Sequence, residues 1–311
     1  MLRFRASGPL FDWAIFAATF SRLEWRWLIL GCLLAYATYF GRALRWAVLL
    51  RAIRPNPDLW ELTKANLIGF TAILLLGRPG EIVRPYLISV KTGTPLTSQL
   101  AIWFLERMFD MVFALGIFGF GLSLVSVSRT RLGGPLKWLL ETGGSLVWIL
   151  SAICLILLVV LRKYPEVFRE RVNAALDVLP DRYAARTQRL VDSFVEGIRP
   201  IRSTPAVVWT IALTAVEWML IAASNLAVLW SFGANKTFGL VDVLIYMGFV
   251  TMGTIVQLPG IGGGMQVVSV IVLHEIFDMP VETAAGVTLV IWLTTFVILL
   301  PVGIPLALHE G

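Results

Sequence analysis

The 311-residue sequence is 58% hydrophobic and only 15% charged, with a mean hydropathy of +0.80 and a formal net charge of +6. A soluble protein is nearer half apolar and a quarter charged, so this composition excludes a soluble enzyme or binding domain and indicates a protein that crosses a membrane several times. In such a protein the basic residues lie mainly in loops facing anionic lipid, so the net charge does not indicate a nucleic-acid partner.

The chain begins with a segment that is too short and too interrupted by charge to span. We expect residues 9–24 to be amphipathic and residues 1–26 to form an interfacial amino-terminal segment. No cleavable signal peptide is expected, because no small-residue cleavage site follows the first apolar run. The first full span is predicted at about 27–50. Arg42 and Arg45 lie near its end and are expected to snorkel to the interface, the alternative being contact with an anionic lipid head group.

Next come two short apolar segments, 60–77 and 81–90, which are separated by Arg78-Pro79-Gly80-Glu81. Pro-Gly breaks a helix, and backbone groups freed at membrane depth must find partners or line a wet cavity. Because the second segment is too short to cross a bilayer, we predict a re-entrant helical hairpin. One full, kinked helix is the alternative.

The remaining apolar runs complete an all-α, polytopic helical bundle. We predict about five full spans in total, with the further four at about 99–125, 145–161, 205–231 and 282–308. Segments 240–258 and 264–277 flank a second break at Leu258-Pro259-Gly260-Ile261-Gly262-Gly263-Gly264, which predicts a second re-entrant hairpin. We expect residues 1–311 to form a single transmembrane domain without a soluble catalytic domain.

The polar segment 162–204 sets the predicted orientation. Its apolar stripe at helical spacing predicts one or two amphipathic helices. Because it is rich in Lys and Arg, we expect this segment and the carboxyl terminus to be cytoplasmic in a cell (inner) membrane.

The two broken segments share a series of matched residues. Gly69-Phe70 matches Gly248-Phe249, Pro79-Gly80 matches Pro259-Gly260, and further matches follow in the same order: Thr94-Pro95 with Met279-Pro280, and Leu100 to Trp103 with Leu289 to Trp292. Three full spans separate the units, so the repeat would be inverted. Paired broken helices in inverted repeats are a recurrent transporter design, with the substrate site between the repeats.

Charged residues inside the apolar stretches are the candidate site. Arg78, Glu81 and Arg84 surround the first break, where a half-helix starting at Gly80 would aim unpaired N–H groups into the gap. With the two arginines, that end could hold a phosphate head group. The alternative is that these residues pair with the next helix and pin the hairpin.

Further charges lie within the later spans. Glu106 and Asp110 share a helix face beside Arg107 and either lock the helices through ion pairs or act on substrate or protons. Glu217 lies near mid-span with Ser224 two turns away, and either couples transport to protons or is a buried, hydrogen-bonded acid. Pro79, Gly80, Pro259, Gly260, Gly262 and Gly263 are predicted to form helix breaks or gates.

No cofactor or metal site is expected. His274 and His309 are isolated, and Cys32 and Cys154 lie inside separate apolar spans. Because no recognisable catalytic motif is present, we do not expect an enzyme.

Four segments resemble the lysylphosphatidylglycerol synthase transmembrane region, a flippase-like domain family: RALRW (42–46), GRPGEIVRPYLI (77–88), FLERMFD (104–110) and LPGIGGG (258–264). The resemblance covers about residues 25–305. It implies a multi-pass bacterial or archaeal membrane protein associated with moving a lipid between leaflets. The family's aminoacyl-transferase domain is absent from this sequence, and an expected amino-terminal span is reduced to residues 9–24. The motif residues carried over are Arg45, Arg78, Pro79, Gly80, Glu81, Arg84, Glu106, Arg107, Asp110, Pro259, Gly260, Gly262 and Gly263.

The sequence therefore predicts a lipid translocase for a lipid with an anionic or phosphate-containing head group. In the hypothesis, Arg78 and Arg84 bind the head group, and Glu106 and Asp110 hold these two arginines in place. The further predicted substrate-binding residues are Glu81, Arg107 and Arg45. The alternatives are a membrane enzyme that modifies a lipid head group and a scaffold of a lipid-synthesis complex. The expected partners are the lipid and lipid-biosynthesis enzymes, and the sequence does not indicate an oligomeric state.

Overall fold

The structure, a computed structural model, describes residues 11–21, 23–128, 134–176, 181–233, 237–253, 257–258 and 262–310. Four helical runs in these ranges are long and apolar enough to cross a membrane: α2 (Trp25–Leu50), α3 (Leu59–Leu76), α9 (Thr204–Ser231) and the run Val281–Glu310. Helices α5 (Leu96–Ser128) and α6 (Gly134–Lys163) have 33 and 30 residues. At 1.5 Å per residue, each exceeds the thickness of a bilayer's hydrocarbon core. The chain is a polytopic helical membrane protein, as predicted.

The chain reverses direction at the first Pro-Gly break. Helix α3 ends at Gly77, the short 3-10 helix η1 covers Arg78–Ile82, and α4 (Val83–Thr92) follows. A Cβ added to Gly80 would lie 2.4 Å from the backbone of Ala72, and one added to Gly69 would lie 2.6 Å from Cβ of Arg84. Helix α4 therefore packs antiparallel on α3, which is the geometry of a helical hairpin and not of one kinked helix. Its re-entry at a single membrane face stays a prediction.

The second break contains a small β-ribbon that the sequence did not predict. The expected helical segment 240–258 is helical over α10 (Leu240–Gly253), whereas its last two residues form β1 (Gln257–Leu258). Strand β1 pairs antiparallel with β2 (Gly262–Gly263), and α11 (Gly264–Glu275) follows. The ladder satisfies backbone groups that a helix would otherwise have used. Tyr246 on α10 and Ser269 on α11 join their hydroxyls at 2.7 Å. Pro259 and Gly260 lie outside the described residues.

The last predicted span is interrupted. Helix α12 (Val281–Thr295) is followed by the 3-10 turn η4 (Val297–Leu299) and by α13 (Leu300–Glu310). Two tyrosines on α2 supply donors at this interruption: Tyr39 donates to the carbonyl of Thr295 at 2.7 Å and Tyr36 to that of Ile298 at 2.5 Å. The interruption therefore has its carbonyls satisfied by a neighbouring helix.

Shorter helices lie at the periphery. Helix α1 (Trp13–Phe20), capped by Asp12, packs against α12, and its location at a membrane interface stays a prediction. The polar segment forms two helices, as predicted: α7 (Pro165–Leu176) and α8 (Asp181–Ile198), followed by the 3-10 helix η2 (Arg199–Arg202). Helix α8 packs on α5, where Ser98 donates to the carbonyl of Ser193 at 2.8 Å.

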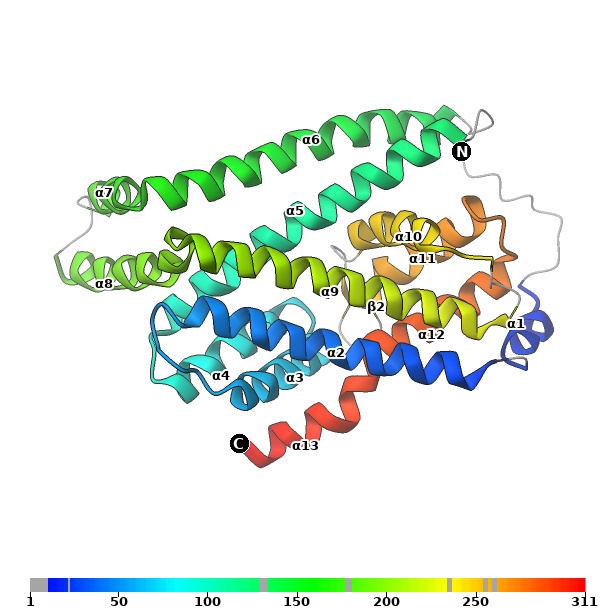
Figure 1. The fold of residues 1–311 in the computed structure, drawn as a ribbon, viewed down its shortest axis with the longest axis horizontal. Coiled ribbons are helices and arrows are strands. Elements are labelled where there is room, and N and C mark those ends of the chain that lie inside the picture. The colour runs from blue at the N-terminus through cyan, green and yellow to red at the C-terminus, as the bar shows by residue number, and fades with distance from the viewer. Residues whose placement is uncertain are drawn as a thin grey trace.

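Helices α2 and α9 form the central pair and run side by side (Figure 1). Ser224 on α9 donates its hydroxyl to the carbonyl of Gly31 on α2 at 2.8 Å. The α3–α4 hairpin lies at the same end of the molecule as α7 and α8, whereas α10 and α11 lie toward the other end, near α1 (Figure 1). The pair thus connects the two hairpin regions.

A group of four charges holds α13 to the first hairpin. The ammonium groups of Lys64 on α3 and Lys91 on α4 lie 3.1 and 2.6 Å from a carboxylate oxygen of Glu310, and both also pair with Glu61. We call Glu61, Lys64, Lys91 and Glu310 the α13 charge cluster.

Candidate functional site

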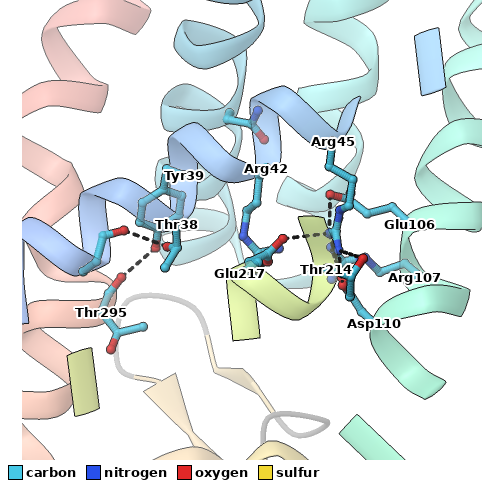
Figure 2. Close-up of polar contacts among 12 residues, drawn as sticks. Thr38, Tyr39, Arg42, Arg45, Glu106, Arg107, Asp110, Thr214, Glu217 and Thr295 are labelled. Carbon is cyan, nitrogen blue, oxygen red and sulfur yellow. Dashed lines mark hydrogen bonds and ion pairs between the residues drawn. The ribbon is translucent and has the colours of Figure 1, made fainter. Parts of the chain in front are cut away.

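Arg45 is the centre of a buried group of charges near the carboxyl-terminal end of α2, where α2 packs against α9 and α5. Its side chain is 0% exposed and is surrounded by groups from two other helices. It donates to Glu106 Oε1 at 2.7 Å and Asp110 Oδ1 at 2.6 Å on α5, and to Thr214 Oγ1 at 2.9 Å on α9 (Figure 2). One guanidinium therefore ties α2, α5 and α9 together through charge-assisted hydrogen bonds.

Glu106 also binds a second arginine, Arg84, which reaches it from α4. Arg84 donates to Asn66 Oδ1 on α3 at 2.9 Å, and its guanidinium lies 4.3 Å from the ring centre of Trp46. The first hairpin is thus joined to the same charges as the central pair. Each contact compensates part of the cost of removing a guanidinium from water.

Glu217 and Arg42 form the third part of the group. Their side chains face each other between α9 and α2, with Arg42 Nη2 2.5 Å from Glu217 Oε1 (Figure 2). Glu217 Oε2 lies 3.2 Å from Arg45 Nη2, and the side chain is 1% exposed. Glu217 is therefore held by two ion pairs, and neither of its carboxylate oxygens accepts a further hydrogen bond from the described residues.

Arg107 is the group's most exposed member, at 34%. Its guanidinium lies 3.1 Å from Asp110 Oδ2 and 3.4 Å from Glu106 Oε2. It therefore marks the side from which the buried charges are accessible. We call the seven residues the central charge network: Arg42, Arg45, Arg84, Glu106, Arg107, Asp110 and Glu217.

The sequence builds this network from simple helical spacing. Arg42 and Arg45 on α2 are three residues apart, as are Thr214 and Glu217 on α9, and Glu106 lies four before Asp110 on α5. Such spacings place side chains on one helix face. Packing α2 against α9 and α5 then brings the three faces together.

The network carries one surplus positive charge, because four arginines (+4) meet three carboxylates (−3). Three of its buried N–H groups also lack a hydrogen-bond partner among the described residues: Arg42 Nη1, Arg45 Nε and Arg107 Nε. A buried donor left unpaired costs free energy. An added anion would supply both the missing charge and the missing acceptors.

Several sequence expectations are corrected here. Arg42 and Arg45 do not snorkel to the surface, because both turn inward to carboxylates on α5 and α9. Arg78 pairs with Glu81 of its own segment at 2.9 Å and is 54% exposed, whereas Arg84 pairs with Glu106 of the next helix, as in the pinning alternative. Ser224, two turns from Glu217, donates to Gly31.

The other predicted site residues fall into three groups. Arg45, Arg84, Arg107, Glu106, Asp110 and Glu217 meet in the central charge network. Pairing of the two acids with Arg84 and Arg107 was expected, whereas their pairing with Arg45 was not. Pro79 and Gly80 lie in η1, and Gly262 and Gly263 form β2. Whether any of these residues bind or gate a substrate stays a prediction.

Two network partners were not anticipated: Asn66 and Thr214, which accept from Arg84 and Arg45. Asn66 is a polar residue within an apolar run, and Thr214 lies one turn before Glu217 on the same face. Those positions were the signals available in the sequence. Among the residues that the structure describes, no group of three His, Cys, Asp or Glu could hold a metal ion.

Comparison with known proteins gives one match. The family model described as "Lysylphosphatidylglycerol synthase TM region" matches residues 8–303. No curated protein and no solved structure matches the chain.

Proposed function

The chain belongs to the lysylphosphatidylglycerol synthase TM region family, and from that premise we propose that it binds a lipid with an anionic or phosphate-containing head group and moves it between leaflets. The family is a membrane domain related to lipid handling. The proposal adds the transport step, the head-group class and the residues that bind it.

The observation that carries the proposal is the unbalanced central charge network. A surplus positive charge and three unpartnered guanidinium N–H groups are costly inside a membrane protein unless an anion joins them. Phosphate oxygens are preferred acceptors for arginine. Arg107, the most exposed of the four arginines, would meet the head group first.

The proposed route uses the two hairpins as gates. The hairpins lie toward opposite ends of the molecule, on either side of the central α2–α9 pair (Figure 1). The matched glycine–phenylalanine pairs have similar surroundings, since Phe70 packs edge-on against Tyr39 at 5.1 Å and Phe249 against Phe118 at 5.2 Å. This supports, as part of the proposal, an inverted repeat of re-entrant hairpins with alternating access to the network.

We propose that the end carrying the first hairpin faces the cytoplasm of a cell (inner) membrane. Basic side chains gather in the loops and helix ends there: Arg51, Arg54, Lys64, Lys91, Arg199 and Arg202. Such residues favour the cytoplasmic side. Residues 162–204 and α13 would then have their cytoplasmic location.

The first prediction concerns lipid selection. Native mass spectrometry of the purified protein should show one anionic lipid class retained by the wild type and at least about tenfold depleted in Arg107→Gln, which loses the surplus charge and two of the network's ion pairs. Arg202→Gln is the matched control, because it removes an exposed arginine paired with Glu166 outside the network. Arg78→Gln tests whether the exposed arginine at the break also binds lipid.

The retained lipid, labelled on an acyl chain, is then followed in proteoliposomes. The wild type should move it between leaflets and Arg107→Gln should not. Equal, unselective lipid retention by well-folded wild type and Arg107→Gln would refute the head-group site. Chemical conversion of the lipid would favour a membrane enzyme, and tight co-purification with a lipid-synthesis protein without leaflet movement would favour a scaffold.

A further inference from the structure

Two buried glutamates in the central charge network are held in different ways. Glu106 accepts hydrogen bonds from both Arg45 and Arg84. Glu217 lies within ion-pair distance of Arg42 and Arg45, yet neither of its oxygens accepts a hydrogen bond from the described residues. Of the two carboxylates, Glu217 has ion pairs with two arginines and Glu106 with three, so fewer contacts are lost when Glu217 gives up an arginine.

Arg42, the arginine that faces Glu217, has an N–H group that is not used in a hydrogen bond to the described residues. Among the residues that the structure describes, Arg42 Nη1 and Arg45 Nε are buried and have no hydrogen-bond partner. A phosphate oxygen at this position would accept the N–H groups that Glu217 leaves unused. A phosphate head group and the Glu217 carboxylate cannot both bind these two guanidiniums without a large cost in free energy. The reason is that like charges repel strongly where water is excluded.

Resting on the proposed function, we propose that the head group displaces Glu217 from Arg42 and that Glu217 then takes up one proton from the side on which the lipid entered. The carboxylate becomes a neutral carboxylic acid, because an unpaired buried carboxylate is too costly to keep ionised. No other bond forms or breaks. Release of the lipid on the opposite side returns Arg42 to Glu217, and the proton leaves there.

Simple addition of the anion would neutralise the network's surplus charge. In this exchange, the proton taken up by Glu217 offsets the charge of the head group, so the network keeps its total charge. With the head group bound, the network has four arginines (+4), two carboxylates (−2) and one head-group charge (−1). The total of +1 equals that of the empty network. One monoanionic lipid and one proton cross together, so the transport step moves no net charge.

Other titratable groups around Glu217 already have partners or lie elsewhere. Arg42, Arg45 and Tyr39 face it from α2, and Glu106 and Asp110 approach from α5, where Arg107 and Arg45 hold them. Tyr39 donates to the carbonyl of Thr295. Helices α10 and α12 carry Asp242 and Glu282 in their first turns, the Tyr246 hydroxyl of α10 bonds Ser269, and η2 carries Arg199 and Arg202.

The test counts protons. Dihexanoyl phosphatidylglycerol, a short monoanionic phosphodiester lipid, is titrated into the full-length protein in detergent by calorimetry, in two buffers that differ in ionisation enthalpy. We expect the wild type to take up about one proton per lipid bound, so that its Kd rises about tenfold per pH unit where Glu217 is ionised. Glu217→Gln should bind with no proton uptake and a flat pH profile. Glu282→Gln, a glutamate outside the network, should match the wild type.

A second measurement covers the case in which Glu217→Gln does not fold. In wild-type proteoliposomes, a pH gradient should drive acyl-labelled phosphatidylglycerol toward the alkaline side, and a membrane potential of either sign should have no effect. Lipid binding without proton uptake by the wild type, or movement that follows the potential, overturns the exchange while leaving the proposed function intact. Absence of binding of this and every other anionic lipid overturns both.

Discussion

Glu106 and Glu61 each pair with more than one cationic side chain, yet their surroundings differ. Glu106 pairs with Arg45, Arg84 and Arg107 in the central charge network and is 1% exposed. Glu61 pairs with Lys64 and Lys91 in the α13 charge cluster and is 34% exposed. Water can replace the partners of Glu61 but not those of Glu106. The exposed pairs of Glu61 therefore contribute little to stability. Removal of one partner from the buried pairs of Glu106 is strongly destabilising, because it leaves a buried charge unpaired.

The largest expected effect is the difference in lost stability between alanine substitutions of these two glutamates. Glu106→Ala leaves two buried guanidiniums without their shared carboxylate and should lower the free energy of unfolding by about 3–5 kcal/mol. Glu61→Ala should cost at most about 1 kcal/mol. Unfolding in mixed micelles of denaturing and mild detergent measures both. Equal losses would show that burial does not distinguish the two groups.

A smaller effect should come from the helix packing that positions Arg84. Gly69→Ala places a Cβ 2.6 Å from Cβ of Arg84, so the hairpin must open and pull Arg84 away from Glu106, at a cost of about 1–3 kcal/mol. Gly41→Ala is the matched control, because a Cβ there meets nothing within 4 Å. It should be neutral or slightly stabilising in the same unfolding assay. A neutral Gly69→Ala would contradict the close approach of α3 and α4.

The smallest expected effect is the change that salt makes to the destabilisation by these two alanine substitutions. Raising ionic strength from about 0.15 M to about 1 M shortens the Debye length from roughly 8 to roughly 3 Å. The cost of Glu61→Ala should then fall toward zero, while that of Glu106→Ala should remain. Loss of the Glu106 effect in high salt would mean that ions and water reach the centre of the protein.

Helix boundaries were largely predictable from the sequence, because long apolar runs and Pro-Gly breaks act locally. The predicted spans at 27–50 and 205–231 correspond to Trp25–Leu50 and Thr204–Ser231. The observed helix boundaries differ from the predicted ones where tertiary contacts determine the backbone conformation. Gln257 and Leu258 pair in the β-ribbon where a helix was expected, and α12 ends early where tyrosines of α2 bind carbonyls of Thr295 and Ile298.

Most members of the charge network were candidate site residues in the sequence, but the membership of Arg42 and the pairing of the charges were not predicted. A mid-span Glu217 required a partner, and Arg42 lay eight residues inside the end of a span. At 1.5 Å per residue that depth is about 12 Å, which is far for a side chain to reach the interface. Snorkelling was nevertheless predicted, because residues 175 positions apart meet only through the packing of α2 against α9.

The contact between α2 and α9 has a practical consequence for measuring motion. Its hydrogen bond from Ser224 to Gly31 and the Arg42–Glu217 and Arg45–Glu217 pairs cross one interface at several depths. Those two helices therefore provide an internal coordinate frame. Spectroscopic labels on α4 and α11, each measured against a reference label on the outer face of α2 or α9, would report the displacement of either hairpin separately.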